Sequence, residues 1–160
     1  MRVYTLFLVD PVQSHCVCTS LRMATRSVNR LYDRALAGVG LRVTAYSIMS
    51  RLAEEGPLSI SELAGRLAME RTTCSREVAP LVTAGLVESA VGSDRRRRVL
   101  RLTRLGARKR AQALPLWERV QRTVADEFGD ADVADLLARL HRLRDTAWAL
   151  ERTDSKGNQP

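Results

Sequence analysis

The side chains best suited to chemistry in this chain are arginines gathered in a predicted turn. The run reads Gly92, Ser93, Asp94, Arg95, Arg96, Arg97 and Arg98. Short alternating apolar stretches flank it at residues 86–91 and 99–102, so we expect a β-hairpin with the four arginines at its tip. Guanidinium suits phosphate and narrow minor grooves, and a polyanion relieves the repulsion among clustered cations. The turn therefore predicts a nucleic-acid contact, against the alternative of a solvated basic turn.

A second set of side chains suited to DNA lies on a predicted helix just before this hairpin. Cys74, Val78 and Leu81 share one face of that helix and should pack inward. Around its N-terminal half this leaves two arginines and three hydroxyl residues, namely Arg71, Thr72, Thr73, Ser75 and Arg76. These types suit phosphate and base-edge contacts, and a helix N-terminus itself attracts phosphate. The alternative role of the two threonines is helix capping.

Thiols near the N-terminus offer a different chemistry. Cys16 and Cys18 follow His15, and thiolates with imidazole at short spacing suit zinc or copper(I). Only Cys74 and His141 remain elsewhere to complete four ligands, so we expect no metal and no cofactor. If both thiols lie on a helix, Cys16 and Cys18 point about 200° apart, which disfavours a disulfide between them.

Helical periodicity dominates the segments that must position these side chains. The predicted helices cover residues 14–37, 43–54, 59–67, 71–84, 104–128 and 131–151. Ser59 and Glu62 match the capping box, and Thr103 is a plausible N-cap for the long helix after the hairpin. Pro115 should kink or break that long helix. The last helix carries a leucine seam at heptad spacing.

A short helix, a turn, a second helix and a basic hairpin are the order of a winged helix-turn-helix. The predicted fold is mainly α with a small β-wing, flanked by N- and C-terminal dimerisation helices. We expect an N-terminal arm and dimerisation helix at residues 1–40, the DNA-binding domain at 41–104, dimerisation helices at 105–152 and a disordered tail at 153–160. The 160 residues, 45% hydrophobic, suffice for one compact domain or two small ones.

Charge and cysteine content narrow the partners and the location. The net charge of +8 favours nucleic acid or an anionic membrane surface. The apolar residues 3–9 are shorter than the roughly 18 that a spanning helix needs, and they lack a signal-peptide cleavage site. Three cysteines do not make a disulfide framework in a chain of this size. We therefore expect no membrane segment and a reducing cytoplasm.

The sequence resembles the MarR family of bacterial transcription regulators over about residues 16–150. The matching pieces are Leu31-Tyr32, Gly40-Leu41, Ser61-Glu62-Leu63-Ala64, Arg71-Thr72-Thr73, residues 81–87, Ser93-Asp94-Arg95-Arg96 and residues 102–106. The resemblance implies a homodimer, built from both ends of the chain, that binds a pseudo-palindromic operator in double-stranded DNA as a repressor.

The resemblance also implies roles in the wing. Asp94 would orient Arg96, which would enter the minor groove from the wing tip. The neighbouring Arg95, Arg97 and Arg98 would be auxiliary phosphate contacts. Arg98 could instead pair with Asp94 and be structural.

Two modes of release from DNA follow from the resemblance. In one, a small aromatic ligand binds between the dimer helices and the winged domain. In the other, an oxidant acts on Cys18, which precedes Tyr32 by fourteen residues, as in the organic-hydroperoxide sensors of the family. There two tyrosines hydrogen-bond a reactive thiolate, and Val43 stands at the second tyrosine position here, which leaves the thiolate less stabilised. The alternative for Cys18 is a small buried hydrophobe of the dimer seam.

Other function classes stay open at this level. A nonspecific architectural protein would bind all DNA sequences alike, with a steep dependence on salt. A thiol peroxidase using Cys18 would need an activating group, for which only Arg22 and His15 are near in sequence, so we expect no enzyme. The seam helices could also form a three-helix bundle within one chain in place of a dimer.

Overall fold

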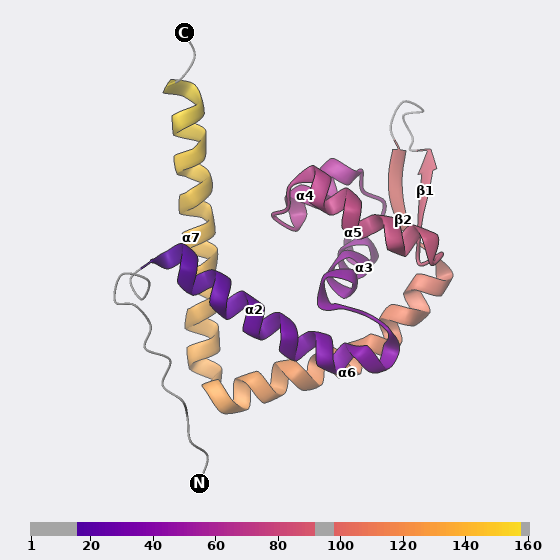
Figure 1. Ribbon diagram of the computed structural model, residues 1–160, viewed down its shortest axis with the longest axis horizontal. Helices are drawn as coiled ribbons and strands as arrows, with labels where there is room; N and C mark the ends of the chain where they lie inside the picture. The colour runs from indigo at the N-terminus through magenta and orange to yellow at the C-terminus, as the bar shows by residue number, and fades with distance from the viewer. Residues whose placement is uncertain (1–15, 92–97, 158–160) are drawn as a thin grey trace. The chain divides into compact units, whose positions relative to one another are not determined.

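The computed structural model describes residues 16–91 and 98–157 of the chain. Its elements in chain order are α2 (Val17–Leu36), the 3-10 helix η1 (Ala37–Val39), α3 (Val43–Glu55), α4 (Ile60–Arg66), α5 (Arg71–Thr83), β1 (Val87–Val91), β2 (Arg98–Leu102), α6 (Arg104–Phe128) and α7 (Asp130–Gly157) (Figure 1). These confirm a mainly helical fold with one small hairpin. The chain forms two compact units, Met1–Trp117 and Glu118–Pro160. Among the described helices, none combines the length and apolar character that crossing a membrane requires.

The core of the first unit collects one apolar face from each of its elements. Leu36 of α2, Ile48 and Met49 of α3, Leu63 of α4 and Val87 of β1 are all fully buried in it. On the helices the buried side chains recur at helical spacing, as Tyr46, Met49 and Leu52 do on α3, which is why the periodicity of the sequence located the helices correctly. The helix α3 contributes the most residues and lies at the centre of the unit.

The helix α4 begins with the predicted capping box. The Ser59 hydroxyl accepts a hydrogen bond from the Glu62 amide at 3.3 Å, and the Glu62 carboxylate accepts one from the Ser59 amide at 2.8 Å. This reciprocal pair satisfies amides that the start of a helix leaves unpaired. A tight turn through Ala68 (φ 50°) then leads into α5, which gives the helix-turn-helix.

The hairpin after α5 is antiparallel, with Val87 opposite Leu102 and Val91 opposite Arg98. Arg98 is therefore a strand residue, and the prediction that all four arginines sit at the tip is wrong for it. Outside the hairpin, Leu58 pairs with Leu100 through two backbone hydrogen bonds of 3.1 and 2.7 Å. These bonds fix the wing to the segment between α3 and α4.

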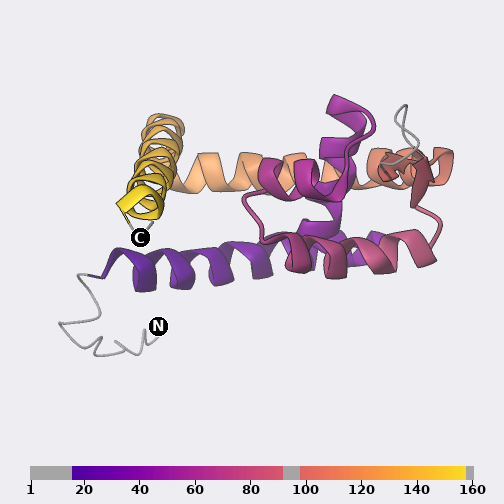
Figure 2. The same cartoon turned by 90° about the horizontal axis from the view of Figure 1, so that it is seen from above.

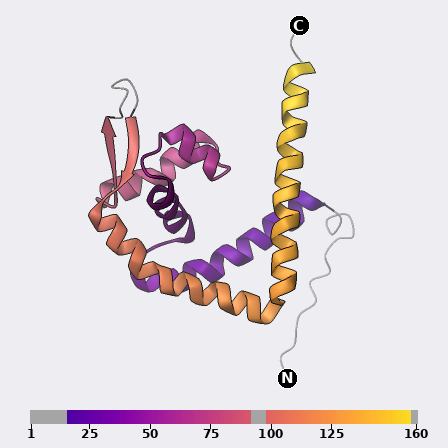
Figure 3. The ribbon, with the colours of Figure 1, turned by 180° about the vertical axis from the view of Figure 1, so that it is seen from behind.

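The start of α6 is fastened to the foot of the hairpin (Figure 3). The Thr103 hydroxyl accepts a hydrogen bond from the Gly106 amide at 3.0 Å and donates to the Gly85 carbonyl at 2.7 Å, so the predicted cap is confirmed. A Cβ at position 106 would collide with the Leu86 carbonyl, which explains the glycine there. Farther on, α6 continues through Pro115 without a break; the ring removes only one hydrogen-bond donor from the exposed side of the helix.

The second unit contains the end of α6 and all of α7, separated at Gly129 (φ 97°). The helix α7 runs to Gly157, so residues 153–157 are helical, in contrast to the predicted disordered tail. The Thr153 hydroxyl bonds to the Ala149 and Leu150 carbonyls, which is a normal helical contact. Residues 158–160 lie outside the described part of the chain.

Candidate nucleic-acid interface

The N-terminal half of α5 presents the predicted DNA-reading side chains. Cys74, Val78 and Leu81 are buried, as the periodicity predicted. The rest of this half carries four exposed side chains and the half-buried Thr73; the exposed ones are Arg71, Thr72, Ser75 and Arg76.

Neither threonine caps the helix. The N-cap of α5 is Glu70, and its side chain makes no capping hydrogen bond. Thr72 and Thr73 lie inside the first turn, after the N-cap position. The amides of this turn and the two arginines of the helix, Arg71 and Arg76, therefore form a positively polarised end that suits phosphate.

A hollow of about 530 Å³ separates α5 from the wing. Arg71 and Ser75 line it from α5, and Ser89 and Arg98 line it from the hairpin. The Arg98 guanidinium donates from Nε to the Ser89 hydroxyl at 3.0 Å and from a terminal nitrogen to the Ser89 carbonyl at 3.5 Å. Arg98 thus lies along the wing and braces its two strands. The pairing with Asp94 considered for it lies outside the described residues.

The other predicted wing residues, Asp94, Arg95, Arg96 and Arg97, lie outside the described residues. Their assignment to the wing tip and the minor groove stays a prediction. The described strands on either side end at Val91 and begin at Arg98, so the run does connect two paired strands.

The thiols at the start of α2 differ in one respect from the expectation. Cys16 is the N-cap of α2, with an extended backbone (φ −82°, ψ 110°), so it does not lie on the helix with Cys18. The angle between the two thiols is therefore not set by helical geometry. Both side chains are exposed in the single chain. Hydrogen bonds from the Thr19 hydroxyl and amide lower the pKa of the Cys16 thiol.

Tyr32, the predicted partner of Cys18, lies near the other end of the same straight helix (Figure 2). Fourteen residues of α-helix span about 21 Å, so Tyr32 cannot reach Cys18 within one chain. Tyr32 is buried, and burial raises the pKa of its phenol. A contact between the two would need Tyr32 from a second copy of the chain.

We expect the lowered pKa of Cys16 to appear in its reactivity. In a Cys18→Ser, Cys74→Ser variant, alkylation by iodoacetamide should reach half its maximal rate at a lower pH in the folded protein than in urea, because only the thiolate reacts. Adding Thr19→Val should move the folded profile back toward that of the unfolded chain. Identical folded and unfolded profiles would contradict the assignment.

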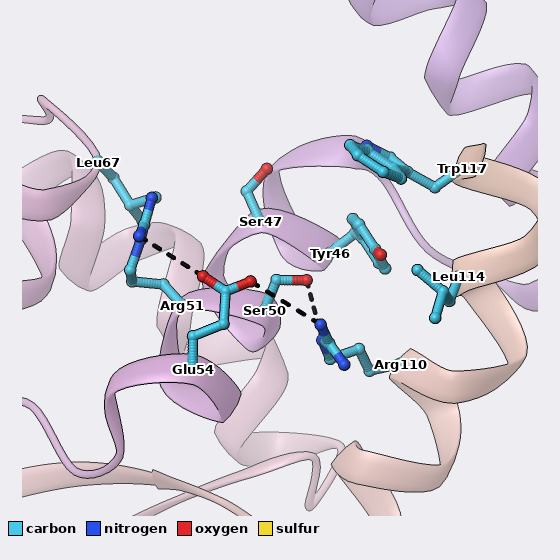
Figure 4. Close-up of a pocket in the computed structure, with 9 residues that line it drawn as sticks. All are labelled: Tyr46, Ser47, Ser50, Arg51, Glu54, Leu67, Arg110, Leu114 and Trp117. Atoms are coloured by element: carbon cyan, nitrogen blue, oxygen red, sulfur yellow. Dashed lines mark hydrogen bonds and ion pairs between the residues drawn. The ribbon is translucent and has the colours of Figure 1, made fainter. Parts of the chain in front are cut away.

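A pocket of about 400 Å³ lies on the first unit between α3 and α6 (Figure 4). One side is aromatic, where the Tyr46 and Trp117 rings stack with centroids 5.8 Å apart. The other side is polar, where Arg110 of α6 donates to the Ser50 hydroxyl at 3.0 Å and lies 3.9 Å from the Glu54 carboxylate. An aromatic wall beside a guanidinium is suited to an aromatic anion.

Sequence analysis did not single out Arg110 or Trp117. The two residues are seven apart on one helix and share the face that also carries Leu114. That spacing could have indicated that Arg110 lies on the same face as Trp117. The partners Ser50 and Glu54 could not be found in this way, because they lie on another helix about sixty residues earlier.

Comparison with known proteins agrees with this geometry. A family model described as the MarR family matches residues 39–97, which contain α3, α4, α5 and the start of the wing. No curated protein sequence matches the chain.

Three solved structures have the same architecture. The M. tuberculosis transcriptional regulator MosR in complex with DNA is 34% identical, with a TM-score of 0.72, and the match covers 82% of this chain and 98% of that chain. A second structure of that regulator is 33% identical, with a TM-score of 0.71, and the match covers 82% of this chain and 97% of that chain. A mutant of MarR from E. coli complexed with operator DNA is 19% identical, with a TM-score of 0.75, and the match covers 84% of this chain and 99% of that chain. At that identity it shows the fold alone.

The helix-turn-helix, the antiparallel wing and the long flanking helices thus recur over nearly the full length of a relative that shares a third of its residues. The chain belongs to the MarR family.

Proposed function

We propose that this chain is a homodimeric, sequence-specific DNA-binding regulator that represses transcription from a pseudo-palindromic operator. The observation that carries the proposal is the exposed face of α5, where Arg71, Thr72, Ser75 and Arg76 stand around an uncapped helix N-terminus. Arginine and hydroxyl side chains at that position of a recognition helix can contact both phosphates and base edges. The relative MosR has been solved in complex with DNA, which supports the same use of this fold.

The apolar side chains of α7 support a dimer. Five large ones are exposed in the single chain, namely Leu136, Leu137, Leu143, Trp148 and Leu150. At helical spacing they form one stripe, and such a stripe is stable in water only when another surface covers it. A second copy of the chain would cover it and would supply a second recognition helix. Two such helices about one DNA turn apart read a pseudo-palindrome.

Selection from a pool of random duplexes tests this function. The purified protein should enrich one sequence with two inverted half-sites, and it should bind that duplex at least about a thousandfold more tightly than a shuffled duplex at the same salt concentration. A protein that contacts DNA with only one copy of α5 and without the wing would discriminate less between the selected and the shuffled duplex. Uniform affinity for all duplexes, falling steeply with salt, would instead identify a nonspecific architectural protein.

For the effector, we propose an aromatic anion that binds in the pocket between α3 and α6. The stacked Tyr46 and Trp117 rings offer an apolar wall, and the Arg110 guanidinium offers a charge-assisted contact. Arg110 is also bound to Ser50 and lies near Glu54. An incoming carboxylate would compete with Glu54 for Arg110, and so the ligand would favour one arrangement of α3 and α6 over another.

Tryptophan fluorescence can test the pocket in a Trp148→Phe background, in which Trp117 is the remaining indole. We expect 4-hydroxybenzoate to quench it and the neutral analogue 4-hydroxybenzyl alcohol to bind more weakly. Replacing Arg110 with methionine, which keeps much of the stem but no charge, should weaken binding of 4-hydroxybenzoate about tenfold or more. Equal affinity of the anion for both proteins would remove Arg110 from the site.

A second route of release that we propose is oxidation of the N-terminal thiols. Its support is that Cys16 and Cys18 are both exposed and that the pKa of Cys16 is lowered. The thiolate is the form that peroxides oxidise. Cumene hydroperoxide should therefore release the protein from its selected duplex, and Cys16→Ser and Cys18→Ser variants separate the two thiols. Release that persists in the double variant would exclude both.

A further inference from the structure

The central helix of the DNA-reading unit lacks a cap of its own. The N-cap position of α3 is Arg42, whose side chain makes no capping hydrogen bond, and the first turn of α3 contains no acidic residue. The start of an α-helix leaves backbone amides without partners and carries a partial positive charge. Something outside α3 must therefore satisfy this end.

That group is the carboxylate of Asp33, which belongs to the preceding helix. Its Oδ1 accepts a hydrogen bond from the Val43 amide at 2.7 Å, in a partly buried position. Asp33 lies one turn before the end of α2, between the buried side chains of Tyr32 and Leu36. The contact thus joins α2 to the first amide of α3 through a charged hydrogen bond. The buried residues Tyr32 and Leu36 hold this part of α2 against the core.

The other end of α3 is tied to two further elements. Glu55 pairs with Arg66 of α4 at 2.7 Å, and Arg110 of α6 bonds to Ser50 at 3.0 Å. Along its length, α3 packs against α5 and β2 in the same core. If α3 rotated about its fixed C-terminal end, the recognition helix α5 and the wing strand β2 would therefore move with it.

We propose that Asp33 is a positioning residue for DNA recognition, because its contact with Val43 fixes the direction in which α2 leaves the DNA-reading unit. The inference rests on the proposed dimeric regulator. The exposed apolar side chains of α2, Val17, Met23 and Val28, would belong to its dimer seam. If α2 is part of that seam, the joint at Asp33 sets the separation of the two recognition helices, and thereby the half-site spacing that the dimer prefers.

The experiment compares Asp33→Ala, Asp33→Asn and the unchanged protein on the duplex that the unchanged protein selects from a random pool. Each is also measured on versions with one base pair inserted or removed between the half-sites, and on a shuffled duplex. Asp33→Asn keeps an acceptor oxygen for Val43, and Asp33→Ala removes it. Asn29→Ala, exposed one turn earlier on α2, serves as the control on the same helix.

We expect Asp33→Ala to bind the selected duplex roughly tenfold more weakly, with unchanged affinity for the shuffled duplex and a flatter dependence on spacing. Asp33→Asn should retain most of the spacing preference, because asparagine also caps helices well. Circular dichroism and the oligomeric state should match those of the unchanged protein.

Three results would overturn the inference. One is an unchanged spacing preference in Asp33→Ala. Another is an equal loss of affinity for selected and shuffled duplexes, which would identify a purely structural residue. The third is that the unchanged protein binds all half-site spacings equally well. That result would contradict the proposed dimeric regulator as well as the role of Asp33, whereas the first two results would contradict the role of Asp33 alone.

Discussion

Replacing Arg76 with alanine is expected to abolish most sequence discrimination while leaving the fold intact. Arg76 is exposed on the face of α5 opposite the buried Cys74, Val78 and Leu81. A bidentate arginine contact to a base contributes about 1–3 kcal/mol of discrimination, and the dimer has two copies of it. We therefore expect affinity for the selected duplex to fall at least about thirtyfold, with little change for a shuffled duplex.

Arg76→Lys separates base reading from charge. Lysine keeps the cation but lacks the planar fork, so it should preserve affinity for shuffled DNA and still lose discrimination. Arg122→Ala removes an equal charge from an exposed position on α6 and should change neither affinity. Full discrimination in Arg76→Lys would mean that Arg76 contacts only phosphate. The salt dependence of binding would then show one lost ionic contact for each chain of the dimer in Arg76→Ala.

The second large effect is expected in the leucine seam of α7. Leu136 and Leu143 are 42% and 38% exposed in the single chain, and they lie two helical turns apart on one stripe. Replacing both with glutamate would place four carboxylates in a dimer seam, where each leucine otherwise contributes about 1.5–3 kcal/mol of burial. Sedimentation should show a monomer at concentrations where the unchanged protein is a dimer. Operator affinity should fall at least about a hundredfold, because bivalency is lost.

The matched control for the seam is Ala138→Glu. Ala138 is exposed and lies on the face of α7 opposite the leucine stripe, beside Asp135 and Arg142. This variant adds one carboxylate per chain to the same helix, half of what the seam variant adds, and we expect it to remain dimeric with full operator affinity. If the seam variant stays dimeric, α7 does not form the interface, and a three-helix bundle within one chain regains support.

The sequence allowed the local elements to be predicted well because each depends on neighbouring residues. The capping box at Ser59, the cap at Thr103 and the inward face of α5 at Cys74 and Val78 are all set by spacings of a few residues. The wing was found from its alternating flanks. Its boundary was wrong by one arginine, since the pairing of Arg98 with Val91 depends on strand register.

Contacts between distant segments could not be predicted. The joint between Asp33 and Val43 spans ten residues across a change of helix, and the bond of Arg110 to Ser50 spans sixty. Such pairs depend on how helices pack, which no periodicity encodes. The brace from Arg98 to Ser89 was missed for a related reason, since a basic run suggests solvent or phosphate before it suggests a strand partner.

The prediction for the two N-terminal thiols also depended on where the helix α2 begins. Cys16 and Cys18 were compared as two points on one helix, but α2 begins at Val17 and Cys16 is its N-cap. A shift of one or two residues is common at helix ends. Here it changes the environment of the thiol, because Cys16 precedes the first turn of α2, where Thr19 lowers its pKa.

Hydroxyl-radical footprinting of the selected duplex tests the central claim most directly. A dimer that reads DNA with two copies of α5 and two wings should protect two symmetric half-sites about one helical turn apart, with two chains bound to each duplex. The Arg76→Ala variant should lose this pattern at concentrations where it still binds DNA. A single protected half-site, or uniform protection along the duplex, would contradict the account.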